Sequence, residues 1–230
     1  MTAGSDWESA LAELTSRSAA STALPAAVRE IGLALSFSGR GMVEEARHHG
    51  AAAVKAGLDR EQVVEALLTG LLHGGRGIFS LNRWLLDVAP EPAAPRAAPA
   101  REDDVDVDVS TVVAYFEDVW GGSLPAWLQA VADADPALLL AYHDVRTVAL
   151  GEGALPKRHK ELLIAMMSCV EHYDFGIEVH LRNALACGAS EAEVLDTVRA
   201  SQVAGGIVAW VSGFEIASRV LAEAADTSAS

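Results

Sequence analysis

The apolar positions of this sequence recur at helical spacing, and no useful stretch shows the strict alternation of a half-buried strand. Two segments, 29–37 and 160–169, are apolar enough to be buried helices, and each follows a proline of the kind tolerated in a first helical turn. The other helices expected are 5–18, 45–56, 60–72, 111–120, 124–132, 136–150, 176–187 and 191–203. The pattern predicts an all-α protein.

Residues typical of helix ends stand at the expected boundaries. Gly57 and Gly188 follow two of these helices directly, and glycine is the residue favoured just past a helix C-terminus. Asp59 and Ser190 come next as N-caps, each followed three residues later by Gln or Glu, the spacing of a capping box. We therefore expect a new helix to begin after each of them.

The two halves of the chain repeat one pattern. When the first half is shifted by 131 residues, landmark residues coincide without a gap. The matched pairs include Leu24-Pro25 with Leu155-Pro156, Glu30 with Glu161, His49 with His180, Gly57 with Gly188 and Gly74-Gly75 with Gly205-Gly206. Chance rarely aligns proline, glutamate, histidine and glycines at one offset, so the sequence predicts a tandem duplication.

A break in composition separates the halves. Residues 88–100 read VAPEPAAPRAAPA, and residues 101–108 read REDDVDVD. Such sequence cannot bury much apolar surface and favours extended, solvated chain. The predicted organisation is an N-terminal module over 1–87, a linker over 88–110 and a C-terminal module over 111–226.

Charge and composition narrow the classes of partner. The formal net charge is −15, whereas faces that bind nucleic acid or anionic membranes are basic. We identify no run of about 18 apolar residues that would span a membrane, and residues 1–7 lack the basic flank and apolar stretch of a secretory signal. Two cysteines are too few for a secreted disulfide scaffold. We expect a cytoplasmic protein that binds neither nucleic acid nor membrane.

Each half contains a glutamate followed 19 residues later by a histidine, Glu30 with His49 and Glu161 with His180. A helical hairpin can bring such a pair together in the interior. A buried carboxylate beside an imidazole orients the ring and supports proton transfer. The alternative is a buried ion pair that only fixes the packing of two helices, and retention in both halves fits either role because the halves share an origin.

The sequence around these pairs resembles the carboxymuconolactone decarboxylase / alkylhydroperoxidase D-like superfamily. ALPAAVREIGLAL followed by EEARHHGAAAVKAGLDREQVVEALL is similar to carboxymuconolactone decarboxylases, which carry Glu four positions before the histidine, as Glu45 stands before His49. SLPAWLQAVADADPALLLAYHDV reads like the family's usual lead into its helical hairpin. The resemblance covers residues 24–80 and 111–220 and implies two tandem helical modules of the alkylhydroperoxidase D-like type.

The chain departs from the peroxidase members of this superfamily. Their two cysteines lie 12 and 15 positions after the glutamate, where this chain has Met42 and Glu45 in the first half and Tyr173 and Gly176 in the second. Peroxide reduction on this fold needs a thiolate to attack the peroxide and a second thiol to resolve the product. Dithiol peroxidase activity is therefore not expected.

The resemblance and the Glu/His spacing together define a candidate site. The candidate catalytic residues are His49, Glu45, Glu30, His180 and Glu161. Tyr173, in place of a motif cysteine, and His172 beside it are the candidate substrate-binding residues. No cofactor is expected, and no metal ligands are assigned because the spacing of glutamates and histidines is not a zinc signature.

The function implied is cofactor-independent acid/base chemistry, of decarboxylase, lyase or isomerase type, on a small oxygenated acid, lactone or carbonyl compound. Two alternatives stay open: a metal- or haem-dependent oxidoreductase on the same fold, and an inactive duplicate that binds a ligand or acts as a scaffold. Single-module relatives assemble as rings, so the resemblance also implies a homo-oligomer, with a homotrimer of fused pairs favoured.

Overall fold

The computed structural model describes residues 4–20, 23–94, 96, 108–120 and 122–228, and over these residues it contains eleven α-helices and no strand. The helices are α1 (Gly4–Ala19), α2 (Ala26–Gly39), α3 (Val43–Lys55), α4 (Arg60–Asn82), α5 (Leu85–Val88), α6 (Val109–Val119), α7 (Ala126–Ala134), α8 (Pro136–Leu150), α9 (Lys157–Glu171), α10 (Asp174–Ala186) and α11 (Glu191–Ser228). The predicted all-α fold class is confirmed.

The duplication seen in the sequence is also a repeat of helices. Helices α9, α10 and α11 begin 131 residues after α2, α3 and α4, respectively. Both long helices, α4 and α11, bend at the second glycine of their glycine pair, Gly75 with φ 75° and Gly206 with φ 73°. A side chain would strain this left-handed backbone, so glycine permits the bend in each half.

The two halves share one hydrophobic core. Helices α2 and α9 pack against each other at its centre, α4 of the first half contacts α9, and α11 of the second half contacts α2. The two helices approach closely at Gly32, where an added Cβ would lie 2.8 Å from the sulfur of Met166. Each half thus covers apolar surface that the other would expose.

Two acidic side chains bind the halves together reciprocally. Glu65 on α4 accepts hydrogen bonds from the backbone N–H groups of Ala154 and Leu155, both at 2.8 Å, just before α9. Asp196 on α11 stands in the same register position and accepts from Ala23 and Leu24 just before α2. Glu65 also forms a 2.8 Å ion pair with Lys160, which is 1% exposed. The reciprocity indicates an approximate two-fold relation between the halves.

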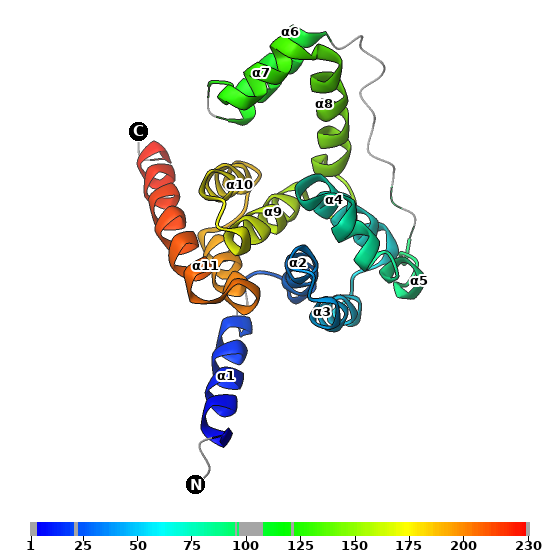
Figure 1. Ribbon diagram of the computed structural model, residues 1–230, viewed down its shortest axis with the longest axis vertical. Helices are drawn as coiled ribbons and strands as arrows, with labels where there is room; N and C mark the ends of the chain where they lie inside the picture. Colours follow the sequence, from blue (N-terminus) through cyan, green and yellow to red (C-terminus); the bar gives the residue numbers. More distant parts are fainter. Residues whose placement is uncertain (1–3, 21–22, 95, 97–107, 121, 229–230) are drawn as a thin grey trace.

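Helices α6, α7 and α8 form a second, smaller apolar cluster around Phe116 and Leu128. By the 131-residue offset, α8 corresponds to α1. Helix α8 packs against α4 of the first half, and α1 packs against α11 of the second half. Figure 1 shows α1 projecting from one end of the body and α6–α8 standing at the other. Over the described residues, α6 and α7 of the second half have no matching helices in the first.

The predicted linker begins where α5 ends at Val88 and finishes as α6 begins at Val109. Asp108 caps α6, accepting a hydrogen bond from the Thr111 N–H. Residues 95 and 97–107 of this linker lie outside the described residues.

Helix α11 exposes several large apolar side chains that a core helix would bury. Ile207, Val208, Trp210, Val211 and Phe214 are exposed on the segment after the bend. In the part of the chain that the structure describes, α11 is also the one helix long and apolar enough to span a membrane by length and composition, a weak indication that core helices also give. The sequence analysis identified no such span, because its criterion was an uninterrupted apolar run.

Candidate functional site

Glu161 and His180 form a buried pair across the hairpin of α9 and α10. His180 Nδ1 lies 2.6 Å from Glu161 Oε2, and the two side chains are 12% and 1% exposed. Glu161 faces inward because it stands on the continuous buried run of α9, residues 159–170. The two side chains expected to meet from their spacing do meet, and they are shielded from water.

The pKa shifts of the pair favour a carboxylate beside a neutral imidazole. Burial lowers the pKa of His180 below its ordinary value, and the hydrogen bond to Glu161 offsets this only in part, while the charges of Arg146 and His73 lower it further. Burial alone would raise the pKa of Glu161, but the hydrogen bond from His180 and the charges of His180 and Arg146 outweigh burial and lower it. The neutral ring therefore donates from Nδ1 to Glu161 and leaves Nε2 as an acceptor.

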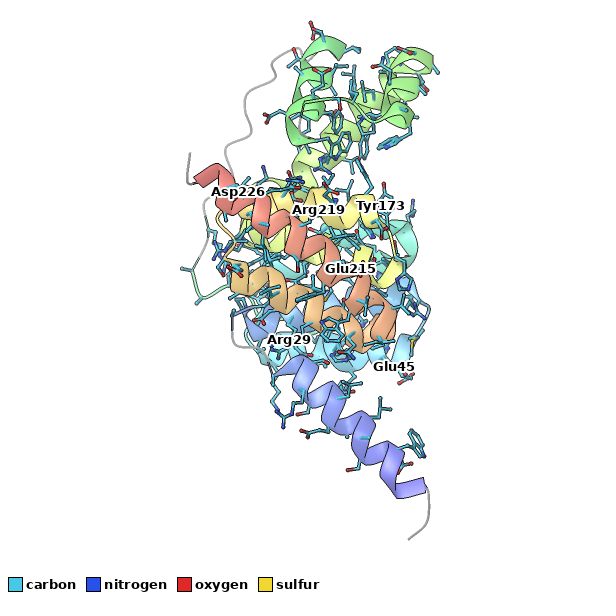
Figure 2. The ribbon with its side chains drawn as sticks, turned by 90° about the vertical axis from the view of Figure 1, so that its left-hand side faces the viewer. Arg29, Glu45, Tyr173, Glu215, Arg219 and Asp226 are labelled. Carbon is cyan, nitrogen blue, oxygen red and sulfur yellow. The ribbon has the colours of Figure 1, made fainter. Side chains whose placement is uncertain are left out.

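A cavity of about 160 Å³ lies beside His180. At about 30 Å³ per molecule this is room for roughly five waters, so the cavity suits a small ligand. Its walls are largely aromatic and come from two parts of the second half: Trp120, Trp127 and Tyr142 from α6–α8, and Tyr173 and Phe175 at the start of α10. Figure 2 shows Tyr173 on the side of the body nearest α6–α8.

Arg146 brings a positive charge to this cavity. It stands on α8, lines the cavity and is 3% exposed. Its guanidinium carbon lies 5.8 Å from the centre of the Trp120 ring, within cation–π range. Its guanidinium shares a side-chain hydrogen bond with Tyr142, one turn earlier on α8, but its Nε has no hydrogen-bond partner. The cavity thus contains a buried cation whose hydrogen-bonding capacity is not fully used.

His73 reaches the same cavity from the first half of the chain. It stands near the bend of α4, and its Nε2 lies 3.0 Å from the carboxylate of Glu171 on α9. Its side chain is 10% exposed. The site of the second half is therefore completed by a residue of the first half, a consequence of the packing of α4 on α9.

The first half repeats the carboxylate–imidazole pair in a different setting. His49 Nδ1 lies 2.7 Å from Glu30 Oε2, and Phe37 stacks on the imidazole at a centroid distance of 5.2 Å. Arg29 donates a second hydrogen bond to Glu30 at 3.1 Å. Burial would raise the pKa of Glu30, but the hydrogen bonds from His49 and Arg29 outweigh it and lower the pKa. In the first half, therefore, an arginine pairs directly with the carboxylate.

The first-half pair lacks the surroundings of the second. Glu45, predicted as an acid/base partner of His49, is exposed on α3, because the ring turns toward α2 and pairs with Glu30 instead. Figure 2 shows Glu45 at the edge of the body near α1. The register counterparts of Arg146 and His73 are Thr15 and Ala204, so neither charged neighbour is repeated.

The two predicted substrate-binding residues are placed differently. Tyr173 lines the cavity, and its contact with substrate stays a prediction. Its ring lies over Gly176, where an added Cβ would clash with Tyr173 Cδ1, so a larger residue at 176 would displace the ring. His172 is exposed and lies outside the cavity, because it ends α9 in a left-handed conformation with φ 56°. Its position does not support the predicted contact with substrate.

The cysteines are poorly placed for thiol chemistry. Burial raises the pKa of the Cys169 thiol to about 12 and also raises the pKa of Cys187. Both thiols are free, and neither lines the cavity beside His180. A thiol held protonated is a weak nucleophile. Over the described ranges, no group of three or more His, Cys, Asp or Glu side chains is arranged to hold a metal ion.

Sequence reasoning missed Arg146, His73 and Trp120 as site residues. None stands near the Glu/His motif in the chain, and each reaches the cavity only through the packing of α4 and α6–α8 around α9 and α10. The sequence held one usable signal: an arginine within the largely apolar segment 136–150, where a buried charge requires a partner or a ligand.

Comparison with known proteins supports the resemblance for the second half. Residues 136–219 match the model of the Carboxymuconolactone decarboxylase family. No curated protein matches the chain. A solved structure of a candidate carboxymuconolactone decarboxylase from Burkholderia xenovorans LB400 is 25% identical, with a TM-score of 0.46, and the alignment covers 53% of this chain and 96% of that one. The family match includes Arg146, Glu161, Tyr173 and His180.

Proposed function

We propose that the chain is a cofactor-independent acid/base enzyme of the decarboxylase, lyase or isomerase type, with its active site in the second half. The observation that carries the proposal is the buried Glu161–His180 pair beside an aromatic cavity, with the pKa of His180 lowered by burial. A base that is neutral at neutral pH and held in orientation by a carboxylate is suited to removing a proton from carbon or oxygen.

In this mechanism Nδ1 of His180 donates to the Glu161 carboxylate throughout, which fixes the ring and stabilises the charge it gains. Nε2 accepts the proton of a substrate bound in the cavity and returns it to the product. The aromatic walls exclude water, which strengthens electrostatic interactions with the charge that develops. The substrate class proposed is a small oxygenated acid, lactone or carbonyl compound.

The test is a panel of small β-keto acids, carboxylated lactones and unsaturated acids, incubated with the protein in D₂O and followed by proton NMR. The proposal predicts loss of CO₂, double-bond migration or deuterium incorporation in at least one compound, at a rate that requires His180. Ligand binding with no proton exchange across the panel would contradict it and favour an inactive, ligand-binding protein.

The pH profile of kcat/KM should fall on its acid side as His180 becomes protonated. We call this fall the acid limb. The pKa of His180 is lowered from 6.5 by burial, with Glu161 opposing the shift and Arg146 and His73 adding to it. The active form is the neutral ring, so kcat/KM should be constant near pH 7 and fall as pH drops through a pKa below 6.5. Arg146→Gln removes a positive charge and should move this limb to higher pH. A wild-type limb above pH 6.5 would contradict the assignment of the base.

We also propose that the chain self-associates, with a homotrimer expected. The support is the exposed apolar surface of α11 after its bend, which includes Val208 and Trp210 and which identical chains could cover. Light scattering coupled to size exclusion should give three times the chain mass of 24.1 kDa. Val208→Glu should lower this mass while circular dichroism stays helical. A wild-type monomer would contradict the proposal.

A further inference from the structure

The guanidinium of Arg146 is the feature of the cavity that the acid/base pair does not use. The side chain is 3% exposed, its Nε is unpartnered, and its guanidinium lies over the Trp120 ring. Removing a charge from water is costly unless the charge is paired and hydrogen-bonded. A protein that keeps such a cation at the wall of a cavity presents it to a ligand that completes its hydrogen bonds.

The surroundings favour a planar anion. Guanidinium offers its N–H donors in a flat fork that matches the two oxygens of a carboxylate. The cavity walls next to it are the rings of Trp120, Trp127 and Tyr142, which suit the flat face of an unsaturated or aromatic group. No carboxylate of the described residues lines this cavity to repel an anion. This holds although the whole chain carries a net charge of −15.

We propose that Arg146 is the anchor for the carboxylate of a small planar, unsaturated or aromatic acid, and that each chain binds one such molecule. The inference rests on the proposed function only in placing the ligand in the same cavity as His180. The carboxylate lies on Arg146, and the remainder of the ligand lies between the aromatic walls with His180 at its side. The first half binds none, because Thr15 stands where Arg146 would be required.

Isothermal titration with benzoate, benzamide and inorganic phosphate tests this on the full chain. Benzoate should bind with a stoichiometry of one per chain. Benzamide has the same shape without the charge and should bind roughly 10-fold or more weakly. Phosphate keeps the charge without the plane or the ring and should not compete with benzoate at equal concentration.

Variants separate the role of Arg146 from a general effect of charge. Arg146→Gln should weaken benzoate roughly 30-fold or more, and Arg146→Lys should recover only part of this because it lacks the fork. Arg76→Gln removes an equal charge from an exposed position on α4 and should leave binding unchanged. Thermal melting shows whether each variant is folded, and the benzoate–benzamide comparison on wild-type protein stands even if Arg146→Gln does not fold.

Equal affinity for benzoate and benzamide, a stoichiometry of two, or phosphate competing as well as benzoate would each overturn the inference. His180→Gln keeps Arg146 and should still bind benzoate. Benzoate binding without turnover of any panel compound would reject the proposed function and keep this inference. Turnover that is lost in His180→Gln but unchanged in Arg146→Gln would keep the proposed function and reject this inference.

Discussion

His180→Gln should lower kcat/KM for the proton-transfer reaction by about 10²- to 10⁴-fold, the usual contribution of a positioned general base. Glutamine roughly preserves the size and polarity of the side chain, but no atom of its amide has a basic lone pair. The loss should appear mainly in kcat, because proton transfer occurs in the transition state while the ligand is held chiefly by other walls of the cavity. Steady-state kinetics on the best compound of the panel measures it.

Glu161→Gln gives a second, dependent measurement. It leaves an acceptor 2.6 Å from His180 Nδ1 but removes the negative charge that supports the protonated ring. The hydrogen bond and charge of Glu161 raise the pKa of His180, so the acid limb of the pH profile should move further down in this variant. If the substitution only disturbed packing, kcat/KM would fall but the pH of its acid limb would not change.

His49→Gln is the matched control, since it makes the same change in the register counterpart. The Glu30–His49 pair adjoins neither Arg146 nor the aromatic cavity, so turnover should stay within about 3-fold of wild type. If His49→Gln abolished turnover and His180→Gln did not, the active site would belong to the first half and the proposed assignment would be wrong.

Glu65→Ala should be the most destabilising of the single changes considered, at about 3–5 kcal/mol. It leaves the ammonium of Lys160, 1% exposed, without its carboxylate, and it removes the acceptor of the Ala154 and Leu155 N–H groups. At roughly 2–4 °C per kcal/mol for a chain of this size, the Tm should fall by about 10 °C. Differential scanning calorimetry and urea unfolding measure the change.

Glu61→Ala provides the control on the same helix. Glu61 pairs with Arg96 on the surface at 3.1 Å, with both side chains more than one third exposed, and such pairs contribute about 1 kcal/mol or less. A Tm for Glu65→Ala no lower than that of Glu61→Ala would show that the link between α4 and α9 does not hold the halves together. Because Glu65 joins the two halves, its loss should also broaden the unfolding transition.

Local signals in the sequence were sufficient for the helices and for the two Glu/His pairs. The capping box at Asp59 is formed, with Gln62 N–H donating to the aspartate at 3.1 Å and the Asp59 N–H donating to Gln62 at 3.2 Å. The capping interaction at Ser190 with Glu193 is formed as well. Such contacts join residues a few positions apart, and a spacing of 19 residues across one hairpin is nearly as local.

Sequence spacing did not decide which carboxylate pairs with His49, nor whether His172 reaches the cavity. Glu45 stands four residues before His49 on one helix face, yet the imidazole turns to Glu30 on the neighbouring helix. His172 stands next to Tyr173 in sequence, and the left-handed turn at the end of α9 sends the two side chains in different directions. Rotamer and turn geometry, set by packing, decided both outcomes.

The sequence by itself determined the all-α class, the duplication with its register of 131 residues, and the position of the Glu/His pair in each half. Only the tertiary structure decided that the pairs are unequal. Helix α4 of the first half brings His73, and α8 brings Arg146, to the cavity beside His180. These contacts join residues far apart in the chain, and no local periodicity or motif encodes them, because they arise when each half buries its apolar surface against the other.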